Sequence, residues 1–203
     1  MGRLSNPRKG TRGLRTRLST ERRRAQLLTI GADLFARRPY GEVSIEEVAE
    51  IARISCGLLY HYFPSKRAFF LAIVEDQSAK LLEASTPDPT LPPLEQLKAG
   101  LDIYIGYAES HPDGFRVTQQ GAATDDDLAR IHRARVSVHR DRILAGLDTM
   151  MTVDEDTRIA VVGWLAFAST AILEWLNNPA VTREQLRDLC ARTLWAAVDL
   201  SGT

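Results

Sequence analysis

Two helix starts lie close together in residues 44–66, SIEEVAEIARISCGLLYHYFPSK, and this arrangement constrains the fold more than any other feature of the chain. Ser44, with Glu47 three residues later, forms the pattern in which a helix cap and the third helical residue bond each other's backbone amides. Ser55 offers a second cap, and Pro64 ends the helix that follows because the residue before a proline disfavours helical backbone angles. The sequence therefore predicts two short helices joined by a turn of three or four residues.

Two short helices joined in this way have the geometry of a helix-turn-helix, whose second helix lays its start in a major groove of DNA. Leu59 and Phe63 lie four residues apart and are expected to face inward. The other large side chains of the second helix would then face the groove and the phosphates: Leu58, Tyr60, His61 and Tyr62. An ordinary pair of short core helices has the same apolar spacing, so the pattern alone leaves both interpretations open.

The residues themselves resemble the DNA-binding domain of the TetR family of bacterial transcription regulators. The second helix in that family carries a small residue, Gly, two residues, Tyr, two residues, Phe and a downstream Lys, and the run from Gly57 to Lys66 fits this pattern. The matching positions are Ser44-Ile45, Val48-Ala49, Ala52, Ile54-Ser55, Gly57, Leu59-Tyr60, Phe63 and Lys66. The resemblance is strong over about residues 20–80 and architectural beyond them. It implies a homodimer with an N-terminal DNA-binding domain and a C-terminal domain that binds a small molecule.

Three positions depart from the family pattern. Arg53 stands where the family usually has a turn glycine, so a left-handed backbone there would cost roughly 1 kcal/mol. Pro39 replaces another frequent glycine, and Leu58 occupies a position that often carries Thr. These changes bear on turn geometry and on DNA sequence preference rather than on the fold.

The resemblance also implies that Ser44, Ser55, Gly57, Tyr60, His61 and Lys66 contact DNA. The full predicted set of DNA-binding residues adds Arg17, Thr20, Cys56, Leu58 and Tyr62. Tyr60 and Lys66 would hold phosphates, which position a protein without reading sequence. Cys56, Leu58, His61 and Tyr62 are the candidates for contacts to base edges. A thiol near a helix start can also sense oxidants, but a side chain small enough to fit against DNA is the more ordinary explanation of Cys56.

Zero net charge conceals a division between the two parts of the chain. Residues 1–67 carry 14 Lys and Arg against 6 Asp and Glu, whereas residues 68–203 carry 12 against 20. The basic excess points to a polyanion partner for the first part, and a solvated charged face is the alternative. Residues 1–19 contain basic residues and no acid, which predicts a flexible arm that follows phosphates or enters a minor groove. A cloning remnant or a solubilising tail would look the same.

Helical periodicity continues through the rest of the chain and predicts an all-α fold with two domains. Residues 20–83 would form the DNA-binding domain, with the helix-turn-helix at 44–63 between helices at about 20–38 and 66–83. Four prolines between residues 84 and 93 exclude a regular helix and mark the boundary. Residues 94–203 would form the regulatory and dimerisation domain, with helices at about 94–110, 113–120, 125–150, 155–177 and from 182 onward.

The C-terminal domain carries large aromatic side chains that would either wall an apolar cavity or fill a solid core. The candidates for a ligand pocket are Tyr104, Tyr107, Phe115, Trp164 and Phe167. Their character favours an apolar effector such as a lipid, an acyl chain or an aromatic compound. The helix at 155–177 is apolar nearly all round, which predicts packing against a second subunit as well as its own core. The expected dimer-interface residues are Trp175, Leu186, Leu189 and Leu194.

The sequence shows no constellation that points to an enzyme: it has no phosphate-binding glycine loop, no Gly-x-Ser-x-Gly and no His-Glu-x-x-His. His132 and His139 share a helix face near Arg135, and Asp125 begins a run of three acids. Polar surface groups and favourable charges at a helix start are the ordinary explanations, so neither a metal site nor a cofactor is predicted.

The expected location in the cell follows from two features that the sequence does not show, a membrane span and a signal peptide. No stretch reaches the roughly 18–20 apolar residues of a membrane span, and the basic start does not resemble a signal peptide. The two cysteines are far apart in sequence, so a cytoplasmic location is expected.

These features together predict a ligand-responsive DNA-binding transcriptional regulator, a repressor released from operator DNA by a small apolar molecule. The alternative is a ligand-independent dimeric DNA-binding or scaffolding protein whose second domain only dimerises. A filled C-terminal core without a cavity would favour that alternative, and activation in place of repression is left open.

Overall fold

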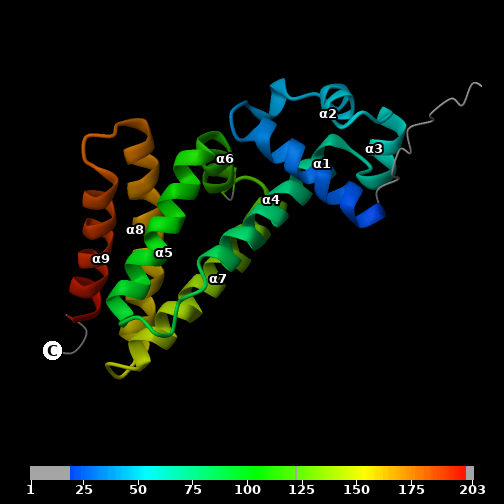
Figure 1. The fold of residues 1–203 in the computed structure, drawn as a ribbon. Helices are drawn as coiled ribbons and strands as arrows, with labels where there is room; N and C mark the ends of the chain where they lie inside the picture. The colour runs from blue at the N-terminus through cyan, green and yellow to red at the C-terminus, as the bar shows by residue number, and fades with distance from the viewer. Residues whose placement is uncertain (1–18, 122, 200–203) are drawn as a thin grey trace, which may run out of the picture.

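The computed structural model describes residues 19–121 and 123–199. Within these residues the secondary structure is helical and contains no strand, which confirms the predicted all-α class. Figure 1 shows a small N-terminal domain at one end of the molecule, with the helices of a larger domain extending away from it.

From residue 19 onward, the N-terminal domain packs four α-helices around one apolar core. Side chains from all four are fully buried there, among them Leu27, Val48, Leu59 and Phe69. The first helix ends three residues before the predicted Arg38. The elements are α1 (Thr20–Phe35), the short 3-10 helix η1 (Tyr40–Glu42), α2 (Ile45–Ala52), α3 (Cys56–Tyr62) and α4 (Lys66–Ala84).

Serine side chains begin all four α-helices of this domain, and two of these caps, Ser44 and Ser55, were predicted from the sequence. Ser44, Ser55 and Ser65 each accept a hydrogen bond from the backbone N–H three residues on, at 3.1, 3.2 and 3.0 Å. The reciprocal half of the cap expected at α2 does not form, because the Glu47 carboxylate accepts a hydrogen bond from Arg38 Nη1 at 2.6 Å instead. The cap on α2 is therefore a single bond, and Glu47 ties α2 to the loop after α1.

Arg53 closes α2 in the left-handed conformation, with φ 55° and ψ 48°. Among the described residues it is the only non-glycine residue with positive φ. Its backbone N–H donates to Glu50 O at 3.0 Å, so the strained residue also satisfies a carbonyl at the end of α2. The turn between α2 and α3 is therefore as tight as expected, at a cost of about 1 kcal/mol relative to glycine.

The described part of the C-terminal domain contains five helices whose bounds lie within two residues of the predicted ones. They are α5 (Pro93–Ser110), α6 (Pro112–Gly121), α7 (Asp126–Asp148), α8 (Glu155–Asn177) and α9 (Arg183–Asp199). α8 and α9 lie side by side in Figure 1 and pack closely against each other. Ile105, Phe115, Val161 and Ile172 are fully buried in the core of this domain.

α8 is long and apolar enough to cross a membrane by length and composition, with a mean hydropathy of 1.8 over 18 residues. The expectation that no stretch reaches this length was therefore wrong. In the fold, Val161, Trp164, Ala168 and Ile172 recur at helical spacing and are buried in the domain core. The opposite face of α8, which includes Ile159 and Val162, is exposed in the single chain.

α4 and α7 run side by side from the N-terminal domain into the C-terminal domain (Figure 1). Near their starts, Arg67 pairs with Asp125 at 2.8 Å and with Asp127 at 2.9 Å. Further along, Arg130 pairs with Glu75 at 3.0 Å. The hydrogen bond from Arg67 is the largest reason why the pKa of Asp125 is lowered to about 2. These ion pairs link α4 and α7 at two places along their length.

Candidate DNA-binding surface and ligand cavity

α3 turns one face to the domain core and the other outward. Leu59 and Phe63 are 0% and 3% exposed, which confirms that they face inward. Leu58 and Tyr60 are 39% and 44% exposed on the opposite face. Tyr62 is half-buried and packs against the N-terminal core, so it presents less surface than its neighbours.

The start of α3 is open. Ser55 and Gly57 are exposed, whereas Cys56 is half-buried against the core. A Cβ added to Gly57 would meet only Ser55 Oγ, at 4.0 Å, so no described residue crowds this position at the start of α3. Three other predicted contacts, Thr20, Ser44 and His61, are exposed as well. The structure therefore brings small and polar groups to one uncovered helix start.

Two basic side chains flank the other end of α3. Lys66 Nζ lies 4.4 Å from the centroid of the Tyr40 ring, and Arg24 Cζ lies 5.3 Å from that of Phe63. Both contacts are of the cation–π kind, which holds a long cationic side chain in place. Arg17 and most of the basic excess lie outside the described residues: residues 19–67 carry 8 basic against 6 acidic residues.

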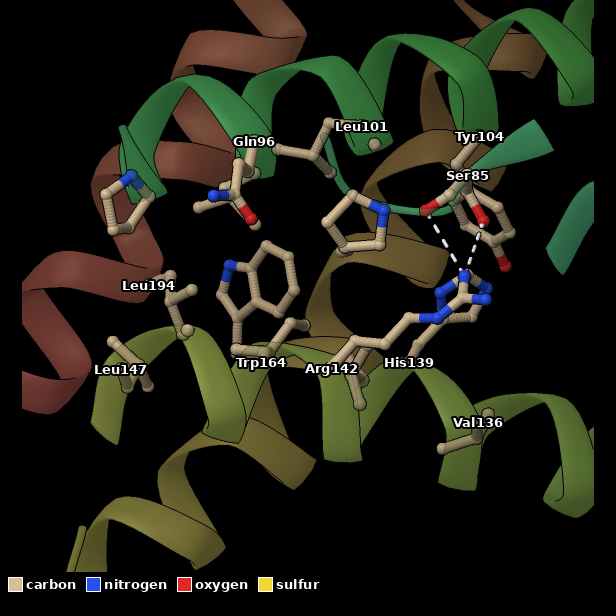
Figure 2. Close-up of a pocket in the computed structure, with 18 of the residues that line it drawn as sticks. Ser85, Gln96, Leu101, Tyr104, Val136, His139, Arg142, Leu147, Trp164 and Leu194 are labelled. Carbon is tan, nitrogen blue, oxygen red and sulfur yellow. Dashed lines mark hydrogen bonds between the residues drawn. The ribbon is translucent and has the colours of Figure 1, made fainter. Parts of the chain in front are cut away.

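A cavity of about 130 Å³ lies in the C-terminal domain, between the end of α4 and helices α5, α7, α8 and α9 (Figure 2). For scale, an engineered apolar cavity of about 150 Å³ holds one benzene ring. Apolar side chains make up most of the lining, among them Leu97, Leu101, Val136, Ile143, Leu147, Leu165, Trp164, Leu194 and Trp195. The C-terminal core is therefore not solidly filled.

Of the five aromatic residues predicted for a ligand pocket, Tyr104 and Trp164 line this cavity. Tyr107 instead stacks on His111, with ring centroids 4.7 Å apart, and Phe115 is fully buried in the core. Phe167 is 37% exposed, because α8 turns Trp164 inward and leaves Phe167 on its outer side. Helical periodicity marks all five as apolar and cannot say which of them meet at a void.

Sequence reasoning missed Arg142, which ties α7 to the end of α4 from within the cavity wall. Arg142 Nη1 donates to Leu82 O at 2.8 Å and to Ser85 O at 3.2 Å, and Nη2 donates to Thr86 Oγ1 at 3.2 Å. The last carbonyls of a helix lack partners within it and carry partial negative charge, so a cation there satisfies and stabilises them. One side chain thus belongs both to the cavity and to the end of α4.

His139 and Arg135 lie one and two turns before Arg142 on the same face of α7, and both line the cavity. Figure 2 shows His139, Arg142, Ser85 and Tyr104 gathered at one end, with Leu147 and Leu194 toward the other. Burial is the main cause that lowers the pKa of His139 to about 4, with further effects from Arg135 and Arg142. The cavity therefore has a cationic end and an apolar end.

Comparison with known proteins assigns both domains. The family described as "Bacterial regulatory proteins, tetR family" matches residues 27–73, over α1 to α4. The family described as "Tetracyclin repressor-like, C-terminal domain" matches residues 93–197, which is more than half of the chain. The chain belongs to the TetR family.

Individual proteins support the same assignment. The crystal structure of a TetR-family transcriptional regulator from Streptomyces coelicolor superposes with a TM-score of 0.83 at 27% identity, over 91% of this chain and 83% of that one. The "HTH-type transcriptional activator FasR" of Mycolicibacterium smegmatis is 25% identical over 170 residues, 80% of this chain and 76% of that protein. The regulator EthR of Mycobacterium tuberculosis is 29% identical over 125 residues, 59% of this chain and 58% of that protein. The chain is thus a transcriptional regulator of the TetR family with a helix-turn-helix DNA-binding domain.

The residues predicted for the TetR-type dimer interface do not all face outward. Leu186 and Leu194 are 3% and 1% exposed and belong to the chain's own core. Trp175 is half-buried, and its Nε1 donates to Val181 O at 2.8 Å. Leu189 is 42% exposed. Helical periodicity marks these residues as apolar and cannot separate those that meet the chain's own core from those that do not.

An exposed apolar face runs along α8 and α9. It comprises Ile159, Val162 and Phe167 on α8 with Leu189 on α9, whose exposed fractions are 64%, 48%, 37% and 42%. Gly163 and Ala166 lie between Val162 and Phe167 on α8 and are exposed too, so small side chains leave this part of the face nearly flat. Apolar surface concentrated on two adjacent helices is typical of an interaction site.

The candidate metal residues stay apart in this TetR-family chain. Asp125 caps α7 by accepting from Asp127 N at 3.0 Å and Leu128 N at 3.2 Å, and His132 Nδ1 lies 3.2 Å from Arg135 Nη2. Among the described residues, no group of three His, Cys, Asp or Glu side chains is positioned to hold a metal ion.

Proposed function

We propose that this TetR-family regulator is a cytoplasmic homodimeric repressor, released from operator DNA when a small, largely apolar molecule binds the C-terminal cavity. The observation that carries the proposal is Arg142, which lines the cavity and holds the end of α4. The other half of α4 is part of the DNA-binding domain, because Phe69, Phe70 and Ile73 are buried in its core. A change at the cavity is thereby communicated to the domain that carries α3.

DNA would bind the outward face of α3 and the helix starts around it. The proposed contacts are Thr20, Ser44, Ser55, Cys56, Gly57, Leu58, Tyr60, His61, Tyr62 and Lys66, together with Arg17 outside the described residues. The exposure of Leu58 and Tyr60 and the open start of α3 support this surface. Lys66 and Tyr60 would meet phosphates, and Leu58 would meet a thymine methyl group.

The proposed dimer uses the exposed apolar face of α8 and α9. Two copies of this face would bury each other's Ile159, Val162, Phe167 and Leu189, and closed homodimers of this two-fold kind are the commonest oligomers. Two reading helices in one dimer fit adjacent major grooves only when they lie about 34–36 Å apart. DNA affinity therefore depends on how α4 of each chain is held.

Ligand control would act as a shift between two arrangements of α4. A ligand changes the balance only as far as it prefers one arrangement, so it must interact with a group that differs between them. Arg142 is such a group, because it holds α4 only while its guanidinium points at Leu82 O and Ser85 O. The cavity also favours this function over the ligand-independent alternative, whose C-terminal domain would need no void.

Fluorescence polarisation on the gene's own upstream DNA tests the proposal, across a range of salt and with a panel of small apolar compounds. We expect specific binding that weakens with salt and is released by at least one compound. Specific binding that no compound affects would favour the ligand-independent alternative. Binding no stronger than to unrelated DNA, even at low salt, would contradict a role on this DNA.

A further inference from the structure

Two buried polar atoms lack a hydrogen-bond partner among the described residues, and both belong to side chains that line the cavity. They are Nε2 of His139 and Nε1 of Trp195. A buried polar group without a partner costs free energy, so native proteins rarely keep one unless something else satisfies it. That both occur at one cavity indicates that the occupant of the cavity supplies hydrogen-bonding atoms.

Arg135 adds an uncompensated charge to the same wall. Its side chain is 4% exposed, and no carboxylate pairs with it within the part of the chain that the structure describes. Its contacts there are the His132 ring nitrogen at 3.2 Å and the Tyr104 ring, whose centroid lies 5.8 Å from Cζ. Neither contact neutralises a buried guanidinium, and burying an unpaired charge is far more costly than burying a neutral polar group.

Arg135 and His139 converge on one place. The two residues lie one turn apart on α7, and both contact Tyr104 of α5: the His139 and Tyr104 ring centroids are 6.0 Å apart. Arg142 follows one turn later and is drawn beside His139 in Figure 2. No Asp or Glu is found among the described residues that line the cavity. An occupant that balances the positive charge at this end of the cavity must therefore be negatively charged.

We propose that the effector is a small amphipathic acid whose carboxylate binds Arg135 and His139 while its apolar body lies along the rest of the cavity. A guanidinium matches a carboxylate with two parallel hydrogen bonds, which a neutral ligand cannot offer. The volume of about 130 Å³ suits an acid with about one ring or a short chain. Leu101, Leu147, Trp164 and Leu194 would surround that body.

The acid also explains how binding reaches α4. A carboxylate is a stronger hydrogen-bond acceptor than a peptide carbonyl, so it competes for Arg142 with Leu82 O and Ser85 O. Loss of those bonds frees the end of α4. The ligand class rests on the proposed function for its regulatory consequence, but the binding chemistry follows from the cavity alone.

The test is isothermal titration of the full chain with a series of acids and their uncharged amides: benzoate, phenylacetate, hexanoate and octanoate. We expect at least one acid to bind ten times or more tighter than its amide. Arg135→Met should weaken binding of that acid at least tenfold and leave the affinity for its amide unchanged. Arg133→Met is the matched control, because Arg133 is exposed on the same helix and does not line the cavity.

Arg135→Met is expected to fold, since it replaces a buried charge by an apolar side chain of similar length. Should it not fold, Arg135→Lys serves instead and should keep the preference for acids at reduced affinity, because an ammonium lacks the planar fork. The inference would be overturned if the amides bound as tightly as the acids or if no acid in the series bound. It would also be overturned if Arg135→Met kept the full wild-type affinity for the acid.

Polarisation with operator DNA separates this inference from the proposed function. Acids that bind the cavity without changing DNA affinity would support the ligand class and contradict ligand-controlled release. Neutral compounds that release DNA while acids leave it bound would overturn the ligand class and support ligand-controlled release.

Discussion

Arg142 Nη1 on α7 lies 2.8 Å from the carbonyl oxygen of Leu82 on α4. One guanidinium therefore holds the last turn of α4, whose first half is part of the DNA-binding domain. Hydrogen bonds from a charged donor contribute about 1.5–3 kcal/mol. We expect Arg142→Met to lower the free energy of unfolding by about that amount. Hydrogen exchange should also become faster at the backbone amides of residues 83–86, and chemical denaturation and exchange mass spectrometry measure the two effects.

The exposed Arg133 is the control for this prediction, because Arg133→Met removes the same charge from α7 without touching α4. Arg142→Met should lose more stability than Arg133→Met by at least about 0.5 kcal/mol, since even an exposed ion pair contributes only about 0.2–1 kcal/mol. Equal stability of Arg142→Met and Arg133→Met would mean that the bonds to Leu82 and Ser85 do not hold α4.

Lys66→Ala should weaken binding to all DNA sequences alike and make binding less sensitive to salt. Each phosphate contact that is lost reduces the slope of log affinity against log salt by about 0.9. Fluorescence polarisation at several salt concentrations gives this slope. Lys80→Ala is the control, since Lys80 pairs with Asp76 within α4 at 2.8 Å and lies beyond the DNA-binding surface. Equal slopes in Lys66→Ala and wild type would remove Lys66 from the phosphate contacts.

The sequence predicted the helices well because their signals are local. Ser44 and Ser55 begin helices where expected, and Arg53 has the left-handed backbone that the family resemblance implied at a turn glycine position. Glu47 shows the limit of such signals: its cap pattern is local, but Arg38, nine residues earlier, takes its carboxylate. Competition from a partner elsewhere in the chain does not show in a local pattern.

The sequence predicted that a cavity could form but not which residues line it. The lining depends on which faces of α5, α7, α8, α9 and the end of α4 meet. Tyr104 and Trp164 were expected at a pocket and line it, whereas Phe115 fills the core and Phe167 faces outward. The cationic end did have a sequence signal, since Arg135, His139 and Arg142 recur on one helix face. Only the fold shows that this face is buried and meets the end of α4.

Arg53→Gly should stabilise the DNA-binding domain by about 1 kcal/mol, because glycine adopts the left-handed conformation without the clash of a side chain. Chemical denaturation measures the gain as a higher midpoint with an unchanged slope. Arg53→Ala keeps the Cβ and therefore the strain, so it should show no gain. A stabilisation of equal size in both variants would point to removal of the arginine charge rather than to relief of backbone strain.

His139 should make stability fall as the pH falls from about 6.5 to 4. The pKa of His139 is lowered from 6.5 to about 4 in the folded protein, chiefly by burial. Between these values the unfolded chain binds a proton that the folded chain does not, so protonation favours unfolding. Its contribution is up to about 3 kcal/mol, at 1.36 kcal/mol for each pKa unit.

His139→Gln should remove this part of the pH dependence, and His61→Gln, on the exposed face of α3, should retain it. Urea denaturation at pH 7 and pH 5 provides the comparison. His132 also has a lowered pKa, for which burial is again the main cause, so some dependence should persist in His139→Gln. A variant that loses stability between pH 7 and pH 5 as steeply as wild type would contradict the role of His139.

Ile159→Glu should separate the proposed dimer into single folded chains. Ile159 is 64% exposed at the apolar face of α8, where a second copy would bury it, and a buried carboxylate without a partner destabilises an interface strongly. Sedimentation at micromolar concentration measures the mass, and circular dichroism confirms that the helices remain. Ile51→Glu is the matched control, because Ile51 is 50% exposed on α2, away from the proposed interface. A dimeric Ile159→Glu would place the interface elsewhere, and a monomeric one that binds operator as tightly as wild type would contradict the need for two reading helices.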